Sequence, residues 1–220
     1  MKKPYELIQK NLARLPDKKK AVASFPIITL SRERGSGGRP IANLVEKQLG
    51  SPWKVYNKEI IDDIAKQTKL ARGIIKEIDE SDIPLIDELI ADFFGERYLN
   101  FSIYHRNLLK ALSTIGQRGH AIIIGRGATF LFPDSLKVRT ICEMEQRIKW
   151  LMEYENMVRS EAIRDIRASD ARRIDFVEHV FKHDPRKAHH YDLVIRTGPH
   201  LSIEDAADLI VAEAKRRFKI

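Results

Sequence analysis

A glycine-rich segment at residues 31–39, SRERGSGGR, carries the clearest chemistry in this sequence. It follows an apolar run and precedes apolar residues at helical spacing. Glycines let backbone N–H groups converge on an anion, and the start of a helix adds about half a positive charge. The pattern therefore predicts a phosphate-binding loop, with candidate ligand residues Ser31, Arg32, Gly35, Ser36, Gly37, Gly38 and Arg39.

The loop departs from the common motif G-x-x-x-x-G-K-[ST]. If Gly37 is the last motif glycine, Gly38 stands at the lysine position and Arg39 at the position of the magnesium-binding hydroxyl. If Arg39 takes the lysine role, Pro40 displaces that hydroxyl. In both registers the usual metal ligand is absent, and Ser36 or Ser31 is the available substitute. Taken alone, the segment also fits a strand-to-helix turn that binds no ligand.

Arginines further along the chain are candidates for holding other phosphates. Arg126 directly follows an apolar run, and open parallel sheets bind ligands at the carboxyl ends of their strands. A guanidinium group there suits a substrate phosphate, because it donates two parallel hydrogen bonds. The alternative is a loop arginine paired with a surface carboxylate.

A second group of arginines lies on one predicted helix around Asp170. Arg173, Arg172 and Arg167 flank this aspartate, and their charge would offset charge that develops during phosphoryl transfer. Asp170 itself either orients one of these arginines, accepts from a nucleotide, or forms an ordinary i,i+3 pair with Arg173. The alternative for each arginine is a solvated helix face.

The elements that position these residues are predicted to form a three-layer α/β fold. Apolar runs at 27–30, 53–56, 121–124, 138–142 and 191–195 indicate buried strands, and helical patterns separate them, which favours a parallel sheet covered on both faces. Gly50 is expected to end the helix after the loop, and Ser202 with Asp205 to begin the last helix. Residues 57–120 are too many for a simple crossover and predict an inserted helical substrate-binding region, with Leu108, Leu109, Leu112 and Ile115 on one face.

Composition excludes several classes of protein. The 220 residues are 43% hydrophobic and 32% charged, which is typical of a folded soluble protein. The single cysteine, Cys142, rules out an internal disulfide, fits a reducing cytoplasm and reads as a small core residue. No stretch approaches the ~18 apolar residues of a membrane span. His189 and His190 lack a set of partner ligands, so no metal site is predicted there.

Read together, the loop and two later segments resemble the cytidylate kinase-like family, related to bacterial cytidylate kinases. The family loop S-R-E-x-G-S-G-G fits residues 31–38 at every fixed position. Residues 122–127, IIIGRG, followed by the Phe-Pro-Asp run at 132–134, are similar to the strand, G-R-D and F-P-D segments of cytidylate kinases. A third segment runs from 163 to 204. The resemblance covers about residues 26–214.

This resemblance implies a P-loop NTPase fold with strand order 2-3-1-4-5, ATP and Mg²⁺ as cofactors, and nucleotides as substrates. It assigns Arg126 to the substrate phosphate and residues 158–188 to a helical lid, inside a kinase-like domain at 26–220 that follows a basic arm at 1–25. The missing lysine is then a family trait. Departures also exist: Gly127 replaces the aspartate of G-R-D, and the lid pattern survives only as Asp170 and Arg173.

Three functional hypotheses follow. The first is an ATP-dependent kinase of a nucleoside monophosphate such as CMP or dCMP, or of a related small acceptor. The second is a nucleotide-binding regulatory module without transfer, suggested by the missing lysine and hydroxyl. The third, nucleic-acid binding, rests only on the net charge of +8 and is disfavoured. The sequence leaves the oligomeric state open, with a homodimer as one option.

Overall fold

The computed structural model describes residues 26–66, 90, 94–95 and 101–220. They fall into two compact units, one with Pro26–Lys58 and Gly119–Ile220 and the other with Glu59–Arg118. The predicted basic arm at 1–25 lies outside the described residues.

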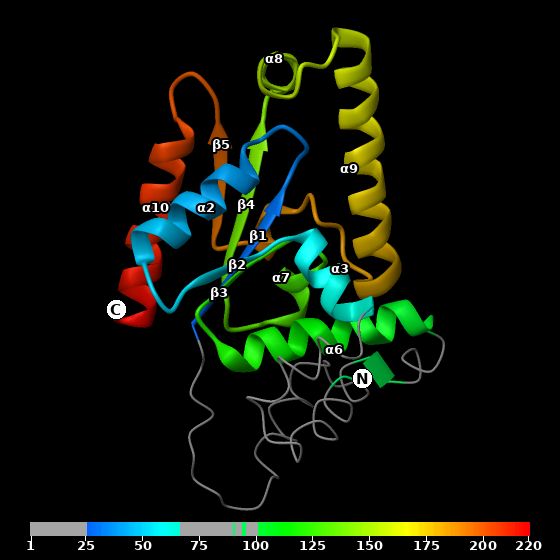
Figure 1. Cartoon of the computed structure of the whole chain (residues 1–220), viewed down its shortest axis with the longest axis vertical. Helices are drawn as coiled ribbons and strands as arrows, with labels where there is room; N and C mark the ends of the chain where they lie inside the picture. Colours follow the sequence, from blue (N-terminus) through cyan, green and yellow to red (C-terminus); the bar gives the residue numbers. More distant parts are fainter. Residues whose placement is uncertain (1–25, 67–89, 91–93, 96–100) are drawn as a thin grey trace, which may run out of the picture. The chain divides into compact units, whose positions relative to one another are not determined.

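The first unit is built on a five-stranded parallel sheet (Figure 1). The strands are β1 (Ile27–Arg32), β2 (Lys54–Tyr56), β3 (Ala121–Ile124), β4 (Leu136–Cys142) and β5 (Leu193–Thr197). Their order, β2-β3-β1-β4-β5, confirms the predicted topology. The register pairs Leu30 of β1 with Ile124 on one side and with Val138 on the other, so β1 lies at the centre of the sheet.

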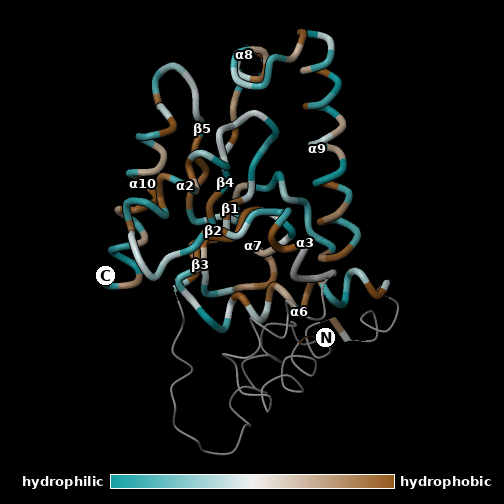
Figure 2. The backbone as a smooth tube through the Cα atoms, in the orientation of Figure 1, coloured by the Kyte–Doolittle hydropathy of each residue, from teal (hydrophilic) through white to brown (hydrophobic). Residues whose placement is uncertain are grey.

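Two helices pack together on one face of this sheet, α2 (Gly38–Leu49) and α10 (Ile203–Phe218). Their buried residues, including Ile41, Val45 and Ile210, form one core with the strands. Each such side chain contributes about 1.5–3 kcal/mol when fully buried. Hydrophobic stretches accordingly concentrate along the strands and the inner sides of the helices (Figure 2).

The predicted ends of these helices are confirmed. Gly50, with a φ of 69°, ends α2. Ser202 begins α10: its hydroxyl accepts from the Asp205 amide over 3.0 Å, and the Asp205 carboxylate accepts from the Ser202 amide over 2.9 Å. This reciprocal capping satisfies two amide groups that the helix itself leaves unpaired.

The remaining elements of the unit follow β3 and β4. A short helix, α7 (Ala128–Leu131), contacts β1, and α8 (Met144–Glu155) leads into the long α9 (Arg159–Phe181). A 3-10 turn at Ala188–His190 precedes β5. The helices α8 and α9 share a small apolar core formed by Ile148, Leu151, Ala162 and Ile166. At its far end α9 brings Phe181 against Gly127, so it runs the length of the unit (Figure 1).

The second unit contains α3 (Lys58–Lys66) and α6 (Ile103–Arg118) among its described elements. The predicted apolar face of α6 is confirmed, because Leu108, Leu109, Leu112 and Ile115 are all buried. The hydroxyl of Tyr104 donates to Asp62 over 3.0 Å. A substrate-binding role for residues 57–120 stays a prediction. Among the described residues, no helix is long and apolar enough to cross a bilayer.

Candidate phosphate-binding site

The glycine-rich loop joins the carboxyl end of the central strand β1 to the start of α2, as the sequence predicts. Gly35 and Gly37 have φ values of 81° and 76°, in the left-handed region that favours glycine. A β-carbon on Gly38 would lie 2.9 Å from Cβ of Arg32, and one on Gly37 would overlap Ile203. Backbone conformation and close approach therefore both select glycine in this loop.

Backbone N–H groups of the loop differ in whether they already have an acceptor. The Ser36 amide donates to the Glu33 carbonyl over 3.3 Å. Within the part of the chain that the structure describes, no protein group accepts from the amides of Gly35, Gly37 or Gly38. These amides lie at the N-terminus of the 12-residue helix α2. They are thus available to an anion such as a phosphate group.

The two loop serines are held by protein groups. The Ser36 hydroxyl is fully buried, lies 2.9 Å from the Thr140 hydroxyl, and is within 3.0 Å of the Glu33 carbonyl oxygen. The Ser31 hydroxyl lies 3.2 Å from both Arg139 Nη1 and the Tyr191 hydroxyl. Neither serine presents a hydroxyl that is ready to bind Mg²⁺. The described residues also contain no group of three or more His, Cys, Asp or Glu side chains that could hold a metal ion, so within them the protein alone offers no complete Mg²⁺ site.

Arg34 fastens the phosphate loop to the helices α8 and α9. Its Nε donates to Asp165 over 2.6 Å, and its two terminal nitrogens donate to the two carboxylate oxygens of Glu155 over 2.7 and 2.5 Å. These hydrogen bonds raise the pKa of Arg34 above its ordinary value, and they lower the pKa of Glu155. The positive charge of Arg34 is therefore directed at carboxylates rather than at the loop amides.

Arg147 of α8 also holds the loop, through the main chain of Arg34. Its Nε donates to the Arg34 carbonyl oxygen over 2.6 Å, and Nη2 makes a very short contact with Asp170 of α9. Its Nη1 lies 3.5 Å from Glu33, which in turn accepts from the Cys142 amide over 3.1 Å. Because Arg147 is only 7% exposed, water screens these interactions little.

Asp170 and Arg173 of α9 contact the loop, and they also form the i,i+3 pair that was one of the alternatives for Asp170. Oδ1 of Asp170 accepts from the Arg34 amide over 2.7 Å and from Arg173 Nη1 over 3.2 Å. Arg173 also lies 3.4 Å from the Arg32 carbonyl oxygen. Burial lowers the pKa of Arg173, and the neighbouring Asp170 opposes that effect.

Within the described residues, the other arginines that the sequence singled out do not contact Asp170 or the Arg34 main chain in the way that Arg173 and Arg147 do. The Arg32 side chain lies between Gly38 and Gly125, where the start of α2 meets the end of β3. Arg126 adopts a φ of 55°, and its guanidinium lies 5.9 Å from the centroid of the Phe176 ring on α9. Three further candidates are exposed and are not gathered into the contacts around the loop: Arg39, Arg167 and Arg172.

Sequence reasoning missed four residues that hold the loop: Arg139, Arg147, Glu155 and Asp165. Two of them leave a signal that could have been read. Arg139 stands within an apolar strand, and Arg147 falls on the same helical face as Leu151. Arginine is almost never buried unless it is paired, so a charged residue at a core position predicts a partner. Glu155 and Asp165 leave no such signal, because they look like ordinary surface carboxylates.

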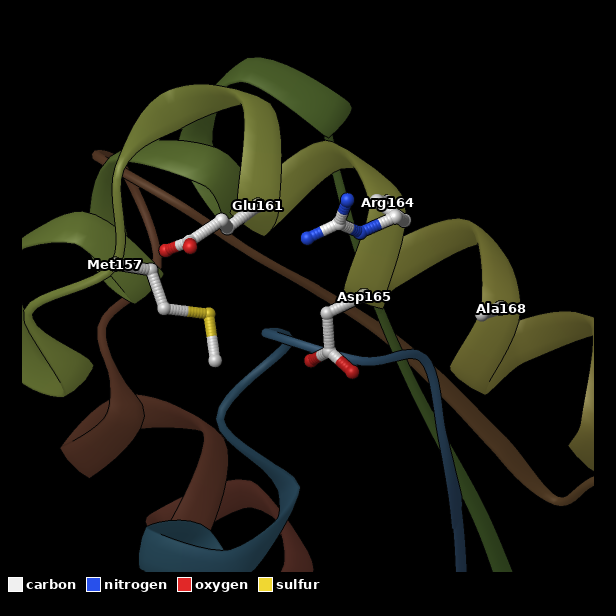
Figure 3. Close-up of a pocket in the computed structure, with 5 residues that line it drawn as sticks. All are labelled: Met157, Glu161, Arg164, Asp165 and Ala168. Atoms are coloured by element: carbon white, nitrogen blue, oxygen red, sulfur yellow. The ribbon is translucent and has the colours of Figure 1, made fainter.

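A pocket of about 420 Å³ opens beside the turn between α8 and α9. It is lined by Met157, Glu161, Arg164, Asp165 and Ala168, and Figure 3 shows the guanidinium of Arg164 directed into the space between Glu161 and Asp165. Asp165 links the pocket to the loop through its bond to Arg34. The volume lies within the ~300–1,000 Å³ range of small-molecule sites. Glu161 and Asp165 offer carboxylate oxygens that accept hydrogen bonds, and Arg164 offers a guanidinium group that donates them.

Known proteins resemble this chain in sequence and in fold. The sequence pattern of the cytidylate kinase-like family matches residues 27–199. An uncharacterised protein from Eubacterium ventriosum has a solved structure with a TM-score of 0.63 and 18% identity, over 87% of this chain and 98% of that chain. Shikimate kinase from Acinetobacter baumannii gives a TM-score of 0.44 at 14% identity, over 88% and 95% of the two chains. Among curated proteins, none matches the sequence.

Proposed function

Because this chain belongs to the cytidylate kinase-like family, we propose that it transfers a phosphoryl group from ATP to a nucleoside monophosphate, with CMP and dCMP as the first candidates. The observation that carries the proposal is the set of uncommitted amides at Gly35, Gly37 and Gly38. They converge at the start of a helix and at the carboxyl edge of a parallel sheet, where such folds bind phosphate.

The donor nucleotide is assigned to the loop and the neighbouring pocket. The glycine amides donate hydrogen bonds to the triphosphate, and Arg32 supplies the charge that lysine usually gives. Arg32 is preferred to Arg39 because its side chain already lies against Gly38, whereas Arg39 is exposed. The pocket lined by Glu161 and Asp165 is proposed for the adenine base, whose amino group donates to a carboxylate.

The acceptor is assigned to Arg126, which follows β3 at the same edge of the sheet. Its guanidinium would hold the monophosphate. The acceptor's phosphate oxygen then forms a bond to the terminal phosphorus of ATP, the bond to the bridging oxygen breaks, and a nucleoside diphosphate and ADP leave. Transfer of this kind depends on positioning and on charge neutralisation rather than on a covalent nucleophile.

The lid role is assigned to α9. Asp170 and Arg173 already contact the loop, while Arg167 and Arg172 would reach phosphate only if α9 moved when substrates bind. Mg²⁺ is expected to arrive with ATP. No step is assigned to it, because the hydroxyls of Ser31 and Ser36 are held by protein groups.

A nucleotide-binding module without transfer is the second candidate. It is favoured by the absence of the motif lysine. It is also favoured by the carboxylate of Asp170, which already accepts the hydrogen bond of the Arg34 amide. The two functions differ in one measurable way. The module binds nucleotide tightly with or without Mg²⁺ and releases no ADP, whereas the kinase releases ADP only when an acceptor is present.

The test is a coupled assay of ADP release with ATP, Mg²⁺ and each common nucleoside monophosphate in turn. The kinase proposal expects turnover with a pyrimidine monophosphate well above the rate without acceptor. Calorimetry with ATP runs in parallel. ATP binding without turnover for every acceptor would favour the regulatory module, and no heat with any nucleoside triphosphate would refute both assignments.

A further inference from the structure

We propose that the carboxylate of Asp170 competes with the donor phosphate for the phosphate loop and is displaced when a triphosphate binds. This inference rests on the proposed function, because it concerns the regulation of the same loop. Its starting observation is the 2.7 Å hydrogen bond from the Arg34 amide to Oδ1 of Asp170. Arg34 directly precedes Gly35, so this amide adjoins the uncommitted amides of the loop.

The position of Asp170 is fixed by further donors. Arg147 contacts Oδ2, and Arg173 Nη1 donates to Oδ1 over 3.2 Å. A main-chain amide and two guanidinium groups are the donors that proteins commonly use for a phosphate oxygen. Asp170 thus receives from the protein the contacts that an anionic ligand of the loop would receive.

A carboxylate and a phosphate that both lie beside the Arg34 amide repel each other, because both are negatively charged. At such close range the effective dielectric of a protein surface leaves much of that repulsion in place. The side chain of Asp170 is 22% exposed, so solvent weakens the repulsion only in part. An incoming triphosphate must therefore displace Asp170 or bind against its charge, and both lower the observed affinity.

Displacement of Asp170 would also weaken the attachment of α9, the proposed lid, to the loop. Asp165, five residues earlier on α9, holds the Arg34 side chain, so two carboxylates of the same helix are bonded to one loop residue. If phosphate removes Asp170 from the loop, α9 loses one of these two attachments. Occupation of the loop and movement of α9 are then linked, and by thermodynamic reciprocity the position of α9 sets the affinity of the loop.

The experiment measures the affinity of inorganic tripolyphosphate for the full chain and for Asp170→Asn by calorimetry. Asparagine keeps an oxygen that can accept from the Arg34 amide but removes the competing charge. The expected result is binding about tenfold tighter than in the unchanged protein, equivalent to about 1.4 kcal/mol. Asp175→Asn is the matched control, since it removes the same charge from an exposed position on α9 and should leave the affinity unchanged.

Equal or weaker binding by Asp170→Asn overturns the inference, and so does an equal gain in Asp175→Asn. If the unchanged protein still shows kinase turnover in that case, the proposed function stands although the inference about Asp170 fails. Tighter binding by Asp170→Asn, together with no transfer to any acceptor by the unchanged protein, supports the inference and refutes the kinase. If neither protein binds tripolyphosphate, the loop assignment fails, and the inference fails with it.

A second measurement needs no variant. In the unchanged protein, the amide resonance of Arg34 is followed by NMR as tripolyphosphate is added. Its acceptor changes from carboxylate to phosphate under the proposal, so its chemical shift moves. The Glu33 amide donates to the Thr140 carbonyl over 3.1 Å and serves as the internal reference that stays in place. An Arg34 resonance that does not move while tripolyphosphate binds overturns the inference.

Discussion

Arg147 donates from Nε to the backbone carbonyl oxygen of Arg34 over 2.6 Å, so a buried side chain of α8 holds the main chain of the phosphate loop. The same guanidinium contacts Asp170 and lies 3.5 Å from Glu33. One residue therefore connects the loop, α8 and α9. Its removal leaves two partly buried carboxylates and one carbonyl without their shared donor.

Arg147→Met should accordingly reduce the free energy of unfolding by about 3 kcal/mol, because breaking a buried charge network is strongly destabilising. Urea denaturation measures the change. The control is Arg159→Met, whose side chain is 55% exposed and pairs with Glu145 at 2.8 Å. That exposed pair is worth under about 1 kcal/mol. Equal losses in the two variants would contradict the role given to Arg147.

Gly37→Ala should abolish most triphosphate binding. Gly37 has a φ of 76°, and a β-carbon there would overlap Ile203, so the loop backbone must shift to admit a methyl group. Gly50→Ala is the matched control, since Gly50 has a φ of 69° but nothing within 4 Å of the added carbon. Both variants lose about 1–3 kcal/mol of stability from backbone strain.

Calorimetry separates the two glycine variants. Affinity for ATP should fall at least about tenfold in Gly37→Ala, or about 1.4 kcal/mol, and stay unchanged in Gly50→Ala. Unchanged affinity in Gly37→Ala would show that the loop amides do not bind the triphosphate.

The sequence predicts the strands of this protein well, because they are short apolar runs bounded by turn residues. All five strands are confirmed, although β1 continues to Arg32, β4 begins at Leu136 and β5 is shifted to Leu193–Thr197. Their order, which the family resemblance implied, is also confirmed. The predicted start of α10 at Ser202 also holds, since a capping pair is a local signal. Features decided by a few neighbouring residues are thus accessible from the sequence.

The contacts of the site were harder to predict. The hydrogen bond from the Arg34 amide to Asp170 joins residues 136 positions apart, and no local pattern encodes it. The Ser36 hydroxyl is held by Thr140 of β4. The sequence shows that these two residues are close only once the pairing register of β1 and β4 is known. Arg167 and Arg173 look equivalent in sequence, yet only Arg173 faces the loop, because helix rotation separates them.

Ser36→Ala should lower stability without changing the requirement for Mg²⁺. The Ser36 hydroxyl is buried against the Thr140 hydroxyl at 2.9 Å, so its loss leaves polar groups unsatisfied at a cost of about 1–2 kcal/mol. Denaturation measures this loss, and a titration of activity against Mg²⁺ concentration measures the metal requirement. A raised Mg²⁺ requirement would instead show that the hydroxyl turns toward the metal.

Glu155→Gln should destabilise the protein at neutral pH but not in acid. The hydrogen bond from Arg34 lowers the pKa of Glu155 below its ordinary value of 4.5. The folded pKa is depressed, so the stabilisation is fully present above pH 4.5 and is lost as the pH falls through the folded pKa.

At pH 7 the expected loss is about 0.5–1 kcal/mol, since the Glu155 side chain is 41% exposed and partly screened. Denaturation curves of the two proteins should converge as the pH falls below the folded pKa. A gap that persists in acid would mean that Glu155 stabilises the fold without its charge.

Arg32→Gln and Arg39→Gln decide which arginine replaces the motif lysine. Arg32 lies between Gly38 and Gly125, beside the proposed triphosphate, while Arg39 is exposed on the first turn of α2. Loss of a charge that stabilises the transition state typically lowers kcat by about 100-fold or more. We expect that effect for Arg32→Gln and a change below about threefold for Arg39→Gln, measured by steady-state kinetics with the best acceptor. The reverse order would assign the lysine role to Arg39 and would require the start of α2 to rearrange when ATP binds.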